Sequence, residues 1–207
     1  MADNGATSPT DYNASGKLKN RWVQVDNSPT GTPSADGSTD LDHFGYRTQG
    51  MLWLRARSID AFGFSRPEDI ATNPKNGKVA VFASTGVDTY EGGVGTIYTI
   101  KTNFNNMNAT LDIVYDGDAD PTRTLRSPDN LEWADDGRLY IQEDEAEEGT
   151  LAGEPLFGAG AANRNEAGIV RMKKNGNSIE RIANIDRSIV LDPTTAGTPV
   201  DQDAGEW

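Results

Sequence analysis

The feature of this sequence that most constrains the fold is a short segment that occurs twice. Ser65-Arg66-Pro67-Glu68-Asp69 is echoed by Arg126-Ser127-Pro128-Asp129-Asn130, and the two prolines lie 61 residues apart. Each copy continues through a short apolar run, a turn at Gly77 or Gly137, and a second apolar run. This order is typical of an acidic turn that leads into a β-hairpin. The chain therefore contains an internal repeat of a supersecondary unit.

The repeat extends over four predicted strands in each copy. In the first copy they lie near Asp69–Thr72, Lys78–Ser84, Gly95–Lys101 and Leu111–Tyr115, and in the second near Asn130–Ala134, Arg138–Glu143, Gly168–Lys173 and Ile179–Asn184. Successive four-stranded units are the blades of a β-propeller. The sequence thus predicts a mainly β, propeller-like domain over residues 46–207, with blade one at about 65–115, blade two at about 126–185 and a loop-rich tail at 186–207. Since a propeller needs about four or more blades to close, these two to three blades are expected to form part of a larger propeller.

The residues before the repeat predict little regular structure. Residues 1–45 are rich in small polar residues and are expected to form a flexible arm and loop with one strand, at Trp22-Val23-Gln24-Val25. Apolar residues then recur at helical spacing from Thr48 to Ala61, with Gly63 as a stop signal. We expect one short helix there, and a strand through Met51–Ala56 is the alternative. No apolar run reaches the roughly 18 residues of a membrane span.

Charge and composition exclude several classes of function. The chain has 32 acidic and 19 basic residues, a net charge of −13, which repels nucleic acids and anionic membranes. It has no cysteine, which excludes disulfides, thiolate zinc sites and a cysteine nucleophile. His43 is the only histidine, so a histidine-rich metal site is excluded as well. Fingerprints of a serine-hydrolase elbow, a P-loop or a dinucleotide site are also missing.

The acidic residues of the repeated turn are the candidate metal ligands. Loops at equivalent places in successive blades converge on the axis of a propeller, so Glu68, Asp69, Asp129 and Asn130 would direct oxygen atoms at a common centre. Asp144 follows a strand of blade two and would lie at the same end. Hard oxygen ligands favour Ca²⁺, with Mg²⁺ or Fe³⁺ as alternatives where carboxylates dominate.

An arginine precedes the proline in each copy. Arg66 and Arg126 beside a bound cation would form a clamp for a phosphate oxyanion. The alternative is that these arginines simply pair with the neighbouring carboxylates and that Pro-Asp-Asn makes a turn. Two other acidic patterns remain open: Asp116–Asp120 looks superficially like a weak calcium loop, and the run from Glu143 onward offers paired carboxylates for a glycosidase without an aromatic sugar platform.

Several of these segments together resemble the later part of PhoX-type alkaline phosphatases. The resemblance covers roughly residues 46 to 207. It rests on Arg66-Pro67-Glu68, Ser127-Pro128-Asp129-Asn130-Leu131, the Asp136-Gly137 turn, Tyr140-Ile141 leading to Asp144, and Asn165-Glu166-Ala167-Gly168-Ile169. It implies an exported six-bladed propeller that hydrolyses phosphate monoesters with a calcium and iron cluster. Members of the family are much longer than 207 residues, and their upstream half supplies further acidic ligands and a cysteine, which this chain lacks.

The resemblance also implies roles for individual residues. Glu68 would be a metal ligand and Arg66 the phosphate-binding residue, with Asp129, Asn130 and Asp144 at or near the metal centre. Asp69, Arg126, Glu166 and Glu206 are additional candidates, the last two in segments that look similar but without an assigned role.

These implications combine into one expected function. The chain would be a calcium-dependent phosphomonoesterase, or the C-terminal portion of one, in which a metal-activated oxygen attacks small phosphate esters, with Ca²⁺ and also Fe³⁺ as cofactors. It would be secreted, periplasmic or at the extracellular surface, and another chain or an upstream segment would complete the propeller. The alternatives are a non-catalytic calcium-binding propeller module in an extracellular assembly, and a propeller that hydrolyses sugars or lactones.

Overall fold

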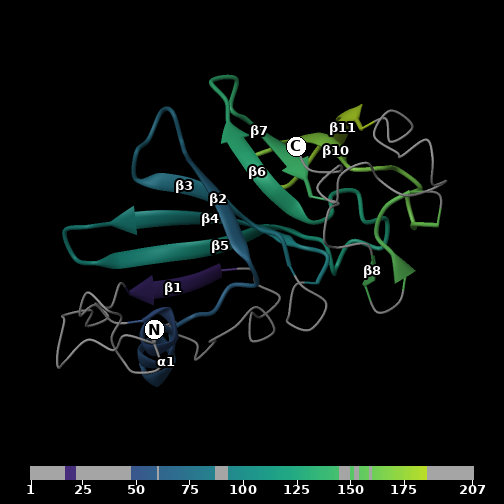
Figure 1. Cartoon of the computed structure of the whole chain (residues 1–207). Helices are drawn as coiled ribbons and strands as arrows, with labels where there is room; N and C mark the ends of the chain where they lie inside the picture. Colours follow the sequence, from purple (N-terminus) through teal and green to yellow (C-terminus); the bar gives the residue numbers. More distant parts are fainter. Residues whose placement is uncertain are drawn as a thin grey trace.

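Two antiparallel sheets form the body of the part of the chain that the structure describes (Figure 1). The structure is a computed structural model, and it describes residues 17–21, 48–59, 61–86, 93–144, 150–151, 154–158 and 160–185. The first sheet has the order β1-β5-β4-β3-β2 and the second the order β11-β10-β7-β6, while β8 and β9 form a separate two-stranded ribbon. The strands are β1 (Lys17–Arg21), β2 (Pro67–Thr72), β3 (Val79–Ser84), β4 (Thr96–Asn103), β5 (Asn108–Asp116), β6 (Pro128–Trp133), β7 (Arg138–Glu143), β8 (Thr150–Leu151), β9 (Glu154–Pro155), β10 (Gly168–Lys173) and β11 (Glu180–Asn184).

The eight strands predicted from the repeat are confirmed. Strands β2 to β5 form blade one, and β6, β7, β10 and β11 form blade two. Strand β1 lies in the predicted N-terminal arm and extends blade one, because it pairs with β5 from Lys17 opposite Asp112 to Arg21 opposite Asn108. The strand predicted at Trp22–Val25 lies outside the described residues.

The two copies of the repeat also match in backbone detail. Pro67 is paired with Ser84 and Pro128 with Glu143, and in both pairs the register shifts within the next three residues. The residue before each proline has a positive φ, 52° at Arg66 and 38° at Ser127, a region that side chains with a Cβ seldom adopt. The repeat seen in the sequence is therefore a repeat of backbone geometry.

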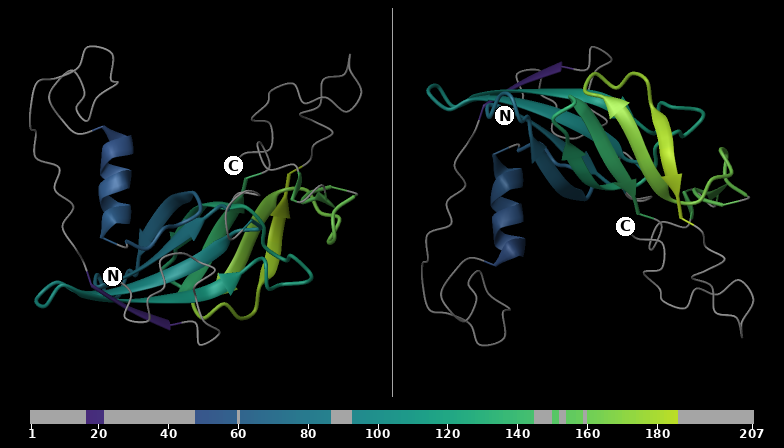
Figure 2. Two further views of the ribbon diagram at one scale, coloured as in Figure 1. Left: turned by 90° about the horizontal axis from the view of Figure 1, so that it is seen from below. Right: turned by 90° about the horizontal axis from the view of Figure 1, so that it is seen from above.

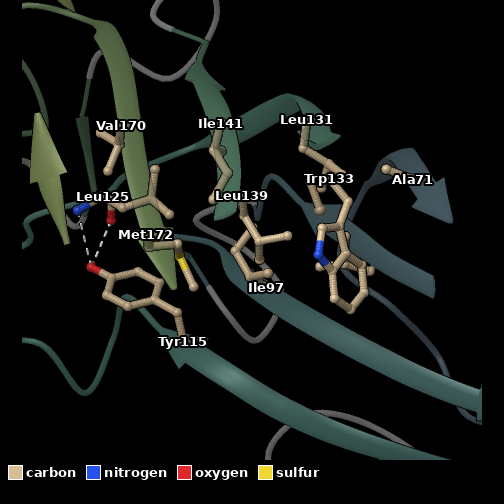
Figure 3. Close-up of a cluster of buried hydrophobic side chains, with 12 residues drawn as sticks. Ala71, Ile97, Tyr115, Leu125, Leu131, Trp133, Leu139, Ile141, Val170 and Met172 are labelled. Atoms are coloured by element: carbon tan, nitrogen blue, oxygen red, sulfur yellow. Dashed lines mark hydrogen bonds between the residues drawn. The ribbon is translucent and has the colours of Figure 1, made fainter. Parts of the chain in front are cut away.

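The blades pack face to face around one apolar core. In β7 the side chains alternate between half-buried and buried, so that Leu139 and Ile141 point toward blade one. Figure 3 shows Trp133 of β6 beside Ala71 of β2, and the ring of Tyr115 with its hydroxyl at Leu125. Full burial of side chains of this size stabilises a fold by about 1.5–3 kcal/mol each. This core fixes the position of blade two relative to blade one.

The predicted helix is confirmed as α1 (Gln49–Ser58), and the alternative strand over Met51–Ala56 is wrong. The Thr48 hydroxyl caps its first turn by accepting a hydrogen bond from the backbone N–H of Met51 at 3.3 Å. None of its residues is buried, and Figure 2 shows it beside the first sheet rather than between the sheets. Within the described residues, no helix combines the length and the hydropathy that crossing a bilayer requires.

Candidate functional site

The residues predicted to form a site gather where β2, β6 and β7 meet between the blades. Arg66 immediately precedes β2, and Asp144 immediately follows β7. The Nη2 atom of Arg66 lies 3.5 Å from Oδ2 of Asp144, and its Nε atom lies 3.5 Å from Oε1 of Glu68. Arg66 thus links a carboxylate of its own blade to a buried carboxylate of the neighbouring blade. The backbone amide of Asp144 is held in turn by the carbonyl of Ser127, at 2.9 Å.

Asp129 lies in the field of these same groups. Burial raises the pKa of the Asp129 carboxyl above its ordinary value, and the negative charges of Asp144 and Glu68 raise it further. The Arg66 guanidinium opposes the shift, and Asp69 adds to it. Three carboxylates therefore repel that of Asp129 while the Arg66 guanidinium attracts it, and a hard cation would relieve this repulsion.

Asp69 and Asn130 make bonds within the protein. The Oδ1 atom of Asp69 accepts from the Ile70 amide at 2.7 Å, and its Oδ2 atom accepts from the Leu131 amide at 2.9 Å. The second bond connects β2 of blade one with β6 of blade two. The side-chain amide of Asn130 donates to Oδ2 of Asp129 at 3.3 Å. Asp69 therefore joins the blades, and Asn130 supports the carboxylate next to it.

Arg126 is placed differently from Arg66. Its side chain is buried, its Nη2 atom lies 3.2 Å from Oε2 of Glu143, and its guanidinium lies 4.1 Å above the ring of Phe157. Burial leaves no exposed guanidinium atom for the phosphate contact predicted from the sequence. By position in the turn the counterpart of Arg66 is Ser127, because the copies read Ser-Arg-Pro and Arg-Ser-Pro. The one-residue offset was visible in the sequence and is the signal that distinguishes the two arginines.

The remaining candidates are Glu166, Glu206 and the loop Asp116–Asp120. The backbone carbonyl of Glu166 accepts hydrogen bonds from Arg126 and Arg181, each at 3.4 Å. Glu206 lies outside the described residues. In the loop that resembles a calcium site, Oδ1 of Asp118 accepts from the Val94 amide at 3.0 Å, so this carboxylate bonds to the protein itself.

The donor set can be tested against the metals that the resemblance implies. Its chemistry fits a hard cation, because the carboxylates at the Arg66 turn are oxygen donors under mutual repulsion. These side chains are spread out, since among the residues that the structure describes no three Asp, Glu, His or Cys side chains are close enough together to hold a metal ion. The pairing of Arg66 with Glu68 and Asp144, an alternative left open by the sequence, is present.

Comparison with known proteins agrees with the sequence resemblance. The family model described as alkaline phosphatase PhoX matches residues 1–188. A solved structure of Pseudomonas fluorescens PhoX in complex with vanadate, a transition state analogue, matches with a TM-score of 0.51 and 18% identity. The match covers 81% of this chain and 32% of that chain, so the present chain spans about a third of its length. At this identity the likeness establishes the mainly β, propeller-like fold. None of the curated proteins matches the chain.

Proposed function

Because this chain belongs to the PhoX alkaline phosphatase family, we propose that it is a phosphomonoesterase or the C-terminal portion of one. The observation that carries the proposal is the position of Arg66. Its guanidinium lies 3.5 Å from a carboxylate of each blade, and its positive charge acts on the Asp129 carboxyl beside them. A phosphate oxyanion that enters beside this group would meet a guanidinium already held in place.

The proposed role of Arg66 is to bind the phosphoryl group. A guanidinium is planar and permanently charged, and it can donate two parallel hydrogen bonds to phosphate oxygens. Glu68 on β2 and Asp144 after β7 would orient it, because they pair with its Nε and Nη2 atoms respectively. As the equatorial oxygens gain charge during transfer, this donor would stabilise them more strongly than it stabilises the substrate.

We propose Glu68, Asp129, Asn130 and Asp144 as the residues that would hold Ca²⁺, with Fe³⁺ as a second ion. Their oxygen donors suit hard cations, and the raised pKa of Asp129 supports a place for added positive charge. Such a cation supplies Lewis-acid stabilisation of the phosphoryl oxygens and activation of an oxygen nucleophile when bound. Asp69 would support the site indirectly, because its carboxylate holds β6 through the hydrogen bond from the Leu131 amide.

The proposal extends to the setting of the reaction. A small phosphate ester would be the substrate, and export to the periplasm or the cell surface is the expected location. Another chain or an upstream segment would complete the ligand set and the propeller, since the match covers only 32% of the solved PhoX chain.

The test combines binding with catalysis. Isothermal titration with Ca²⁺ and with vanadate, followed by an aryl phosphate assay, should show binding and hydrolysis by the wild-type chain. Glu68→Gln should lose both Ca²⁺ binding and hydrolysis while its circular dichroism is unchanged, because only the charge at one donor is removed. Glu132→Gln is the matched control, since Glu132 is an exposed acid on the same strand as Asp129.

The possible outcomes separate the candidate functions. Full hydrolysis by Glu68→Gln would refute its role as a ligand. Ca²⁺ binding by the wild type without any hydrolysis, even with Fe³⁺ added, would instead support a non-catalytic calcium-binding module. Absence of both binding and hydrolysis would reject the proposed site in this chain.

A further inference from the structure

The two blades close the same turn with different residues. In blade one, the hydroxyl of Ser84 donates a short hydrogen bond to the carbonyl of Ser65. The corresponding positions in blade two are Glu143 and Arg126, as the pairing of Pro67 with Ser84 and of Pro128 with Glu143 shows. A serine and a carbonyl are thus sufficient to close this turn. Closing the turn therefore does not explain why blade two has the larger charged pair Arg126 and Glu143.

In blade two the charged pair is part of a buried cluster of three residues. Oε2 of Glu143 lies 3.2 Å from Nη2 of Arg126 and 2.6 Å from Nη1 of Arg181, and Oε1 accepts from Nη2 of Arg181 at 3.0 Å. The Glu143 side chain is 0% exposed, and the side chains of Arg126 and Arg181 are 1% and 13% exposed. A buried ion pair of this kind is weak evidence for stability, because desolvation offsets most of its Coulomb energy.

The donors left over from the ion pairs hold an insertion of blade two. Arg126 donates a short hydrogen bond through Nη1 to the carbonyl of Leu156 and a second, 3.2 Å long, to the carbonyl of Asn165. Its guanidinium covers the ring of Phe157. Arg181 reaches back to the carbonyl of Thr124, which precedes the turn, at 3.3 Å. The cluster therefore joins the described parts of residues 156–166 to the end of blade two.

The same cluster adjoins the candidate site through the backbone. Oε1 of Glu143 accepts from the backbone amide of Arg126 at 2.9 Å, which fixes the strand end to the turn. The next residue is Asp144, whose side chain lies 3.5 Å from Arg66. A displacement of Glu143 would therefore displace Asp144 and remove one of the two carboxylates that orient Arg66.

We propose that Arg126, Glu143 and Arg181 form a positioning cluster that anchors residues 156–158 and 160–166 on blade two and holds Asp144 in place against Arg66. None of the three residues is placed in contact with substrate. The consequence for cation binding rests on the proposed function, whereas the anchoring of the backbone does not. The cluster would thus let blade two carry this insertion without losing the geometry that blade one obtains from the hydroxyl of Ser84 and the carbonyl of Ser65.

The main test replaces the cluster by apolar side chains of similar volume, in the combined variant Arg126→Met, Glu143→Leu and Arg181→Met. Such replacements of buried ion pairs often preserve or increase stability, so the fold should be retained. Hydrogen–deuterium exchange should show the amides of residues 144, 156–158 and 160–166 exchanging at least about ten-fold faster than in the wild type, as expected for lost local protection. The matched control is Arg171→Gln with Glu180→Gln, which removes an exposed ion pair between β10 and β11 in the same sheet.

A second variant covers failure of the triple variant to fold. Arg126→Lys keeps the positive charge but cannot reproduce the forked hydrogen bonds to Glu143 and to the carbonyls of Leu156 and Asn165. It should speed exchange in residues 156–158 and 160–166 while circular dichroism remains that of the wild type. Unchanged exchange at both segments in either folded variant would overturn the positioning cluster.

Titration with Ca²⁺ alone separates this inference from the proposed function. A wild-type chain that binds Ca²⁺ at least about ten-fold more tightly than Arg126→Lys, with the control variant equal to the wild type, would support both. Equal affinity in all three would overturn the link between the cluster and the site. A wild-type chain that binds no Ca²⁺ would reject the proposed cation site, and the exchange comparison would still decide the anchoring.

Discussion

Asp69→Ala is expected to weaken the joint between the two blades. The Asp69 carboxylate accepts from the amides of Ile70, at 2.7 Å, and Leu131, at 2.9 Å, and the second amide belongs to the other blade. Leu131 is 6% exposed, so its amide would lose its partner in a place with little access to water. A hydrogen bond to a charged group contributes about 1.5–3 kcal/mol, and a buried unsatisfied group costs about 1–3 kcal/mol.

These two free energies both describe the loss of the same hydrogen bond, so they are not added. Removing Asp69 also removes one of the charges that raise the pKa of Asp129, which offsets part of the cost. The expected net change in the free energy of unfolding is therefore a decrease of about 1–3 kcal/mol. For a chain of this length, that corresponds to a fall in Tm of about 2–4 °C for each kcal/mol.

Urea denaturation followed by far-ultraviolet circular dichroism is the appropriate assay. The midpoint should fall while the slope of the transition stays constant. Asp69→Asn should lose less, because its amide retains an acceptor oxygen for the Leu131 amide. Asn130→Ala changes the corresponding position in blade two and is the control. An Asp69→Ala chain with the wild-type midpoint would show that the bond between Asp69 and Leu131 does not stabilise the packing of the blades.

Three further substitutions test the apolar core, the loop that contains Asp120, and the close contact between Gly176 and the backbone of Val114. Trp133→Ala should reduce the free energy of unfolding by about 3–5 kcal/mol in urea melts, because Trp133 is 3% exposed between the sheets, and a loss below about 1 kcal/mol would contradict this placement. Although partial burial acts in the opposite direction, hydrogen bonds from two threonines lower the pKa of the Asp120 carboxyl. The Asp120 carboxylate therefore stabilises the fold fully at pH values above the ordinary aspartate pKa of about 3.9, and this stabilisation is lost as the pH falls from there toward the lower pKa of the folded state. Asp120→Asn should for that reason flatten the acid side of a plot of Tm against pH. Gly176→Ala should destabilise more than Gly137→Ala, because both have positive φ but only a Cβ at Gly176 would collide with the carbonyl oxygen of Val114, and equal Tm values would refute this.

The strands and the helix could be predicted because their signals are local. Alternating apolar residues, a glycine turn such as Gly137 and a cap such as Thr48 act over a few neighbouring residues. The different roles of Arg66 and Arg126 could not be predicted from the prolines alone, since the burial of Arg126 depends on Glu143 and on the insertion that covers it. The contacts that decide these roles cross between distant segments.

The candidate site was predicted in part. Glu68 and Asp129 occupy equivalent positions in the two blades, and Asp144 was expected at the same end because it follows a strand of blade two; the charges of Glu68 and Asp144 both act on Asp129. The bonds from Asp69 to the backbone were missed, because a carboxylate in an acidic turn looks the same in sequence whether it binds a cation or an amide. Only the distance between the Leu131 amide and the Asp69 carboxylate in the folded chain shows that this carboxylate binds an amide.

The order of the strands also bears on how quickly the chain can fold. Strands β2 and β3, β4 and β5, and β6 and β7 pair with their neighbours along the sequence as hairpins that close short loops. The pairing of β1 with β5 and the docking of one blade on the other join residues that are far apart in the chain. We expect these late events to limit the folding rate. The bond between Asp69 and Leu131 forms as the blades dock, so its loss should slow folding as well as speed unfolding.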